Sequence, residues 1–198
     1  MTPIIRFATQ DDAAAILAVY APYVVSTGAT FEVTVPRVYD LKRRIASIGA
    51  STPFLVCEMD GEVAGYAYAA GEKTYAAYAW NAYVYVYIDS KYQRCNIASA
   101  LYLAVISLLR AQGYRKVLAK VSSADENSEK FHNAFGFTKV GTLRNAGYKN
   151  GRWYDESLFE KSLDDSESAP ASTKSVTTLN ASFCERNFLQ CAKIIRSR

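Results

Sequence analysis

The sequence is short of the residues that build metal centres. It contains one histidine, His132, and its four cysteines include no Cys-x-x-Cys pair and no other metal-ligand spacing. We therefore expect no bound metal. Cys57 lies in an apolar segment, where a free cysteine behaves as a small core residue.

Glycine fingerprints for nucleotides are missing too. Neither Gly-x-Gly-x-x-Gly nor Gly-x-x-x-x-Gly-Lys-Ser/Thr occurs in the chain, so the Rossmann and P-loop classes lack their supporting residues. The formal net charge of +4 is small, and no basic stripe with interleaved aromatic residues stands out. These absences argue against a nucleic-acid partner.

Signals for membranes and export are also lacking. No run of about 18 apolar residues is present, and the first residues show no charged-then-apolar pattern of a signal peptide. We expect a soluble protein of the reducing cytoplasm, with no membrane partner.

What is present is a mixture of short strands and helices. Half of the 198 residues are hydrophobic, enough for one well-filled core. Strands are predicted over 4–7, 53–58, 62–70, 81–88, 116–121, 138–143 and about 154–162. Helices are predicted from Thr9 to about Pro22, over 39–47, from residue 97 to just before Gly113, and over 127–135. Hairpins with one strand–helix–strand crossover predict an α+β, three-layer fold: a mostly antiparallel mixed sheet flanked by helices.

The composition changes at Asp164, where serine, threonine and acidic residues become frequent. We predict one domain over 1–163, followed over 164–198 by a linker and a poorly ordered extension. The last twenty residues are also compatible with a short amphipathic helix that binds a membrane surface or a partner.

The segment from Val84 to Gln112 is the most informative. An apolar strand runs into a tight turn at residues 89–91, and a short loop then feeds a long helix. Unpaired N–H groups and the positive end of the helix dipole make such a junction an anion site. Arg94 adds a fixed charge suited to phosphate. The segment predicts a phosphate-binding turn.

The order of several segments resembles the GNAT acetyltransferases, specifically the phosphinothricin acetyltransferase group, over about residues 3–163. The segments are IRFATQDDAAAILAVYAPYV, TGATFE, DGEVAGYAYA, AYAWNAYVYVYID, QRCNIASALY, ENSEKFHNAFGF and GTLRNAGYKNGRWYDE. The resemblance implies the GNAT fold and acetyl-CoA as cofactor. It implies direct acetyl transfer to the amine of a small amino-acid-like acceptor of the phosphinothricin or methionine sulfoximine type. Members of the family are commonly homodimers.

The resemblance also implies a cofactor site. The strand backbone would hold the pantetheine arm at Tyr85, Val86, Tyr87 and Ile88. The next loop would hold the pyrophosphate with Gln93, Arg94, Cys95, Asn96, Ile97, Ala98 and Ser99, and Asp125 and Ser128 complete the set.

Asn96 departs from the family pattern, which has glycine at this position. Asparagine is the least costly replacement where φ is positive, but its side chain takes up room that the pyrophosphate oxygens need. We expect CoA binding to persist and weaken. Cys95 is expected to face solvent, where one reading makes it a thiol that exchanges with CoA disulfides.

The catalytic groups are only partly those of the family. Many GNAT enzymes carry a tyrosine acid four residues before a Gly-Phe pair; here His132 precedes Gly136-Phe137 and can exchange protons near pH 7. The family's glutamate base is replaced by Tyr83, a poor base with an ordinary pKa near 10. Water or Glu32 would have to act instead.

The acceptor pocket is expected to be aromatic and basic. Tyr75 stands where the family often has an arginine that captures a carboxylate, and Lys73 supplies a nearby charge. The other candidates for acceptor contacts are Phe31, Tyr78, Lys149 and Arg152. Alternating strand tyrosines also fit ordinary sheet packing.

Two functions therefore stay open. The first is an acetyl-CoA-dependent N-acetyltransferase. The second is a catalytically weakened homologue that binds acyl-CoA as a sensor or interaction module, a reading that Asn96 and Tyr83 favour.

Overall fold

The computed structural model describes residues 3–72, 74–124 and 126–196. Its strands are β1 (Ile4–Phe7), β2 (Phe54–Met59), β3 (Glu62–Gly71), β4 (Asn81–Ile88), β5 (Lys116–Ser122), β6 (Thr138–Lys149) and β7 (Arg152–Ser162). Its α-helices are α1 (Ala13–Ser26), α2 (Val38–Gly49), α3 (Ile97–Gln112), α4 (Glu126–Ala134) and α5 (Ala181–Ala192).

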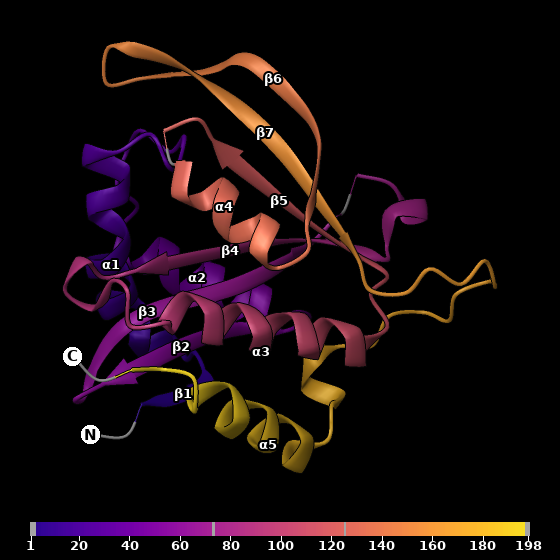
Figure 1. Cartoon of the computed structure of the whole chain (residues 1–198). Coiled ribbons are helices and arrows are strands. Elements are labelled where there is room, and N and C mark those ends of the chain that lie inside the picture. Colours follow the sequence, from indigo (N-terminus) through magenta and orange to yellow (C-terminus); the bar gives the residue numbers. More distant parts are fainter. Residues whose placement is uncertain (1–2, 73, 125, 197–198) are drawn as a thin grey trace.

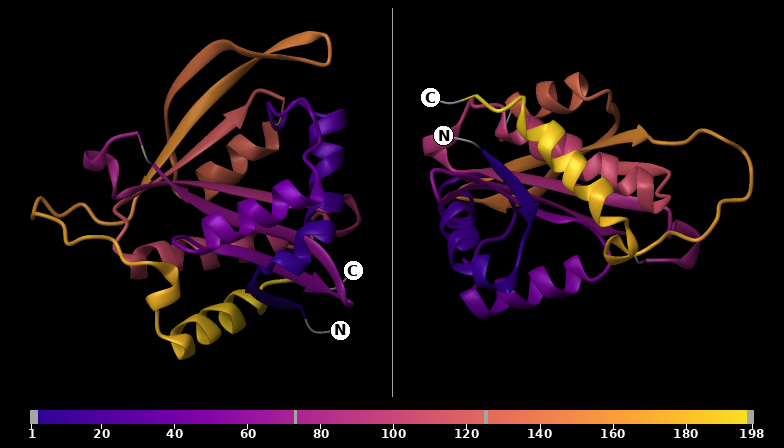
Figure 2. Two further views of the ribbon diagram at one scale, coloured as in Figure 1. Left: turned by 180° about the vertical axis from the view of Figure 1, so that it is seen from behind. Right: turned by 90° about the horizontal axis from the view of Figure 1, so that it is seen from below.

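The strands form one sheet in the order β1-β2-β3-β4-β5-β7-β6. Neighbouring strands are antiparallel except β4 and β5, which are parallel and connected through α3. Helices α3, α4 and α5 cover one face of the sheet, and α1 and α2 cover the other (Figures 1 and 2). The predicted three-layer, mostly antiparallel fold is confirmed.

The predicted capping signal at Thr9 starts a 3-10 turn over Gln10–Asp12, and α1 follows from Ala13 and continues past Pro22 to Ser26. The backbone N–H of Thr9 donates to the Asp12 carboxylate at 2.7 Å, the reciprocal half of a capping box. Arg6 of β1 donates to the same carboxylate at 2.8 Å and also to Glu58 of β2. The guanidinium of Arg6 holds the pKa of Asp12 below its ordinary value. This ion-paired cluster ties the helix start to the edge of the sheet.

Strand β6 is longer than predicted, since it continues past Leu143 to Lys149. The prediction stopped early because the pairing with β7 is irregular between Leu143 and Gly147, where Asn145 has a positive φ of 49°. The hairpin closes through Asn150 and Gly151, both with positive φ, and projects beyond the rest of the sheet (Figure 1).

The C-terminal segment differs from the poorly ordered extension expected from composition. Helix α5 is capped by the Asn180 side chain and lies beside α3 and β1 (Figure 2). Its Phe188 ring meets Phe7 of β1 edge-on, with centroids 5.1 Å apart, and Asn187 donates to the Ala104 carbonyl of α3 at 3.1 Å. Composition misled here because few apolar residues, spaced on one helical face, suffice to dock a helix.

Beyond α5 the chain reaches the loop that precedes α3. The backbone N–H of Arg196 donates to the Cys95 carbonyl at 3.0 Å, and the Asn96 side chain donates to the Ile194 carbonyl at 3.2 Å. The C-terminal segment thus covers the predicted phosphate-binding loop from outside.

We predict that Phe188→Ala lowers the free energy of unfolding by about 1–2 kcal/mol, because a partly buried aromatic side chain loses its apolar contacts. Leu189→Ala is the matched control, since its neighbouring side chain is 67% exposed. Urea unfolding of both variants is the measurement. Equal stability of the two variants would contradict the docking of α5.

Candidate active site

A cavity of about 610 Å³ lies where β4 and β5 separate beneath α3 and α4. It is lined by Tyr23, Ala29, Val84, Tyr85, Val86, Tyr87, Ile88, Tyr92, Gln93, Arg94, Asn96, Ile97, Ala98, Ser99, Tyr102, Lys120, Val121, Ser122, Asn127, Ser128, Phe131 and His132. Most residues predicted for the cofactor line this one cavity. Asp125 lies outside the described residues.

The cavity exists because β4 and β5 stop pairing. The register joins only Asn81–Tyr83 to Lys116–Leu118, although both strands continue for several residues. Backbone groups on that edge of β4 are therefore turned toward the cavity instead of toward β5. At the far end, the Tyr23 hydroxyl donates to the Ile88 carbonyl at 2.7 Å.

The loop before α3 has the backbone shape of an anion site. Arg94 and Asn96 both have positive φ, 64° and 62°, and Asn96 is the N-cap residue of α3. When residues in the right-handed and left-handed backbone regions alternate, successive N–H groups point into one concave site. Asparagine tolerates this conformation better than most residues, so the chain holds the turn without the glycine.

Cys95 is buried, not solvent-facing as predicted. Its side chain is 5% exposed, it is not among the cavity-lining residues, and its Sγ lies 3.7 Å from the Gln93 carbonyl. The prediction was wrong because the C-terminal segment, which bonds to the Cys95 carbonyl, covers this side of the loop.

His132 reaches the cavity from α4. Its Nδ1 lies 2.7 Å from the Ser128 carbonyl, which only accepts, so Nδ1 carries a proton. The ring is 6% exposed and packs against the rings of Tyr102, Phe137 and Phe159 at centroid distances of 5.5, 5.3 and 5.6 Å. The hydrogen bond and these ring contacts together hold the His132 imidazole in one orientation.

Tyr102 of α3 is a cavity residue that sequence reasoning missed. The side chain is 1% exposed, and its hydroxyl has no hydrogen-bond partner among the described residues. Burial raises its pKa well above the ordinary value, so the hydroxyl stays a donor at neutral pH. A signal was available: Tyr102 follows Ala98 of the predicted loop by four residues, which places both on one helix face.

Lys120 and Ser122 of β5 were missed as well, although both line the cavity. They alternate with the buried Val117, Ala119 and Val121. That alternation was readable in the sequence, but the separation of β5 from β4 was not.

Within the part of the chain that the structure describes, the residues predicted to contact the acceptor are absent from this cavity lining. Glu32 pairs with Arg44 at 3.0 Å. Arg152 donates to the Tyr154 hydroxyl at 2.6 Å, and Phe31 and Tyr154 have ring centroids 6.5 Å apart.

Lys149 is 5% exposed and its Nζ donates to the Thr30 carbonyl at 2.8 Å. Burial lowers its pKa. The hydrogen bond to Thr30 connects the end of β6 to the segment that follows α1.

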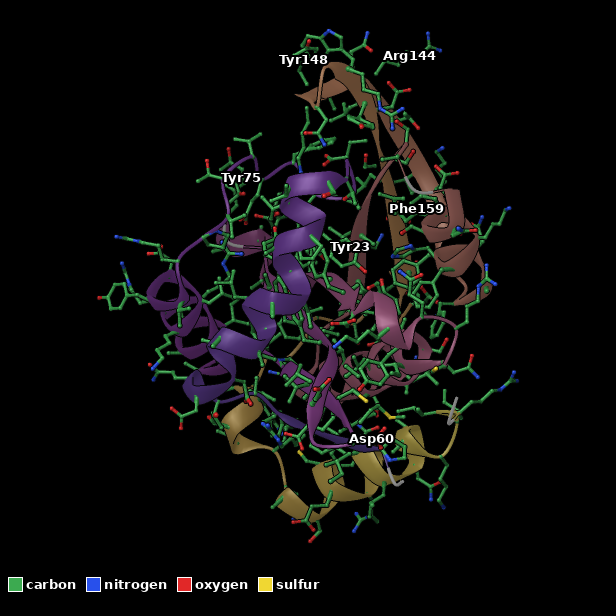
Figure 3. The ribbon with its side chains drawn as sticks, turned by 90° about the vertical axis from the view of Figure 1, so that its left-hand side faces the viewer. Tyr23, Asp60, Tyr75, Arg144, Tyr148 and Phe159 are labelled. Carbon is green, nitrogen blue, oxygen red and sulfur yellow. The ribbon has the colours of Figure 1, made fainter. Side chains whose placement is uncertain are left out.

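The aromatic candidates divide into two groups. Tyr75 and Tyr78 contact each other edge-on at 5.7 Å and are exposed; Figure 3 shows Tyr75 at the periphery and Tyr23 toward the middle of the molecule. Tyr85 stacks on Tyr68 of β3 at 4.7 Å, which is sheet packing. Lys73 lies outside the described residues.

The part of the chain that the structure describes contains no helix long and apolar enough to cross a membrane. Within the same residues, no group of three or more histidine, cysteine, aspartate or glutamate side chains is arranged to hold a metal.

Comparison with known proteins identifies the class. The model of the acetyltransferase (GNAT) domain matches residues 5–158, and the chain belongs to this family. It is 35% identical to the phosphinothricin N-acetyltransferase of Streptomyces viridochromogenes over 81% of this chain and 87% of that protein. It is 29% identical to the L-methionine sulfoximine/L-methionine sulfone acetyltransferase of Salmonella typhimurium over 81% and 95%.

Solved structures agree with this assignment. The crystal structure of a GNAT superfamily phosphinothricin acetyltransferase from Sinorhizobium meliloti in complex with AcCoA superposes with a TM-score of 0.83 at 28% identity. The match covers 90% of this chain and 98% of that one. The predicted family and fold are confirmed.

We predict that Tyr102→Phe raises the free energy of unfolding by about 1 kcal/mol, because a buried hydroxyl without a partner costs about 1–3 kcal/mol to desolvate. Tyr20→Phe is the matched control: it is also buried, but its hydroxyl bonds to the Thr30 hydroxyl at 2.9 Å, so this variant should be less stable than the parent. Thermal unfolding distinguishes them, and a loss of stability in Tyr102→Phe equal to that in Tyr20→Phe would contradict the unpaired hydroxyl.

Proposed function

We propose that this chain transfers an acetyl group from acetyl-CoA to the primary amine of a small amino-acid-like acceptor, of the phosphinothricin or methionine sulfoximine type. The observation that carries the proposal is the cavity at the separation of β4 and β5, which ends at the left-handed loop and N-terminus of α3. The relatives named above support both the donor and the class of acceptor.

The cavity suggests how the cofactor lies. The pantetheine arm follows the β4 backbone from Tyr85 to Ile88, where pairing with β5 has ended. The pyrophosphate meets the loop over 93–99, where backbone N–H groups, the helix dipole and Arg94 favour an anion. Asn96 directs its amide to the Ile194 carbonyl, which supports our expectation that its side chain weakens CoA binding without abolishing it.

His132 and Tyr102 are proposed to act at the sulfur end of the cofactor. Their rings are neighbours in the cavity wall, with centroids 5.5 Å apart. Transfer forms a C–N bond and breaks the C–S bond, so the departing thiolate must gain a proton. The Tyr102 hydroxyl is an uncommitted donor, and the neighbouring His132 imidazole is the second group of the cavity wall that can carry a proton.

One observation still favours the alternative of a weakened acyl-CoA-binding homologue: Tyr83 stands where the glutamate is expected. The cytoplasmic location and the homodimeric state stay predictions. A reducing compartment accords with the four cysteines, all of which are free in the structure.

The decisive experiment incubates the full chain with acetyl-CoA and a panel of small amino-acid amines, including phosphinothricin and methionine sulfoximine, and follows release of the CoA thiol. Amine-dependent thiol release, with the acetylated amine found by mass spectrometry, supports the transferase. Calorimetric binding of acetyl-CoA without turnover would favour the sensor, and absence of binding at millimolar cofactor would reject both.

Arg94→Ala is expected to weaken acetyl-CoA binding about 10- to 100-fold, because a hydrogen bond to a charged group contributes about 1.5–3 kcal/mol. Lys91→Ala is the matched control, since Lys91 pairs with Glu62 at 3.7 Å and is absent from the cavity lining. Calorimetry measures both dissociation constants. An unchanged acetyl-CoA dissociation constant in Arg94→Ala would show that the loop is not part of the cofactor site.

His132→Asn is expected to lower kcat about 100-fold, the usual range for loss of a general acid, while the acetyl-CoA dissociation constant changes by about twofold or less. The measurement is steady-state kinetics beside calorimetry. A parallel loss of binding and turnover would make His132 a packing residue.

A further inference from the structure

Three side chains from separate strands gather on the face of the sheet opposite α3. Tyr83 of β4 pairs in parallel with Leu118 of β5, and Ser122 of β5 pairs with Glu156 of β7. Alternate residues of a strand share a face, so Tyr83, Lys120 and Glu156 point to the same side of the sheet. This side borders the strand separation that forms the cavity.

The contacts place a carboxylate beside Tyr83. Lys120 Nζ lies 5.6 Å from the centre of the Tyr83 ring and 3.4 Å from Glu156 Oε1. Lys120 itself lines the cavity, so the Glu156 carboxylate lies one ion-pair distance from the lining. Its side chain is 19% exposed, which leaves it sheltered and reachable.

The environment of Tyr85 is a second sign of this proximity. Burial raises the pKa of the Tyr85 phenol, and the charge of the Glu156 carboxylate adds to the rise. The backbone of Tyr85 lies where the cavity follows β4. Glu156 is therefore within electrostatic range of Tyr85, and Lys120 lies between Glu156 and the Tyr83 ring.

We infer that Glu156, carried by β7, replaces the carboxylate that β4 lacks at Tyr83, and accepts a proton from the ammonium group of the acceptor. This inference rests on the proposed function. In this inference the carboxylate that acts as the base is on β7 and not on β4. Both positions lie on the same face of the sheet.

The step balances without another reagent. Glu156 takes one proton from the acceptor ammonium, and the freed nitrogen lone pair attacks the thioester carbonyl carbon, so that the C–N bond forms and the C=O electron pair moves to oxygen. When that pair returns, the C–S bond breaks and the thiolate leaves. The nitrogen loses its second proton and the thiolate gains one, which yields amide and thiol; Glu156 returns its proton to water.

The ion pair with Lys120 has a chemical use beyond stability. A partly exposed pair of this kind contributes only about 0–1 kcal/mol to folding, so stability alone gives little reason for it. An amino acid carries both an ammonium and a carboxylate. Between Glu156 and Lys120, each charge of such an acceptor meets a group of opposite sign.

Glu156→Gln tests the inference, because glutamine keeps the size of the side chain and removes its basicity. We expect kcat/KM for the amine to fall about 100-fold or more, with the acetyl-CoA dissociation constant unchanged. Glu160→Gln is the matched control: Glu160 lies four residues along the same strand and pairs with Lys116 at 2.8 Å, and its variant should keep parental kinetics.

The double variant Tyr83→Glu with Glu156→Gln provides the rescue. A carboxylate returned to β4 should recover at least tenfold of the lost kcat/KM. If Glu156→Gln retains parental kcat/KM while the parent is active, the inference is overturned and the proposed function stands. If Glu156→Gln is inactive, folded and not rescued, Glu156 is a structural residue and the inference is likewise overturned. A parent that neither binds acetyl-CoA nor releases thiol overturns the proposed function itself.

Discussion

Parallel pairing between β4 and β5 lasts for three residue pairs and then stops, and the proposed chemistry depends on that separation. In a fully paired sheet, the backbone N–H and C=O groups of β4 would all bond to β5, and no opening would remain between the two strands. Separation turns the same groups toward a cavity on the α3 side and brings Lys120 into its lining. On the face opposite α3, the same lysine lies over the Tyr83 ring and pairs with Glu156.

The C-terminal segment contributes to the other end of the cavity. The family match ends at residue 158, yet α5 packs on α3 and β1, and the residues after it bond to Cys95 and Asn96. An asparagine in the left-handed region carries a modest conformational cost. The hydrogen bond from its side-chain amide to the Ile194 carbonyl offsets part of that cost and directs the side chain toward the C-terminal segment.

The two departures from the family pattern thus have structural counterparts elsewhere in the chain. Asn96, in place of glycine, has a partner in the C-terminal segment. Tyr83, in place of glutamate, has a carboxylate two strands away, with Lys120 between them. In each case the contacting group comes from a distant part of the sequence, so our proposals for both positions depend on contacts that the local motif does not contain.

The sequence by itself determined the class of fold and most of its elements, although it ended β6 early and did not predict that α5 would be ordered. The alternating tyrosines of β4 and the Gly113 stop of α3 act over a few neighbouring residues, which is why they were readable. The left-handed turn before α3 lies within a contiguous segment that the sequence also singled out, which is why it could be expected there.

Only the tertiary structure decided which side chains meet. It buried Cys95, docked α5, left the Tyr102 hydroxyl without a partner and joined Lys120 to Glu156. Asn96 and Ile194 are 98 residues apart. Contacts of this kind depend on the relative placement of whole strands and helices through the core, and no local pattern encodes that placement.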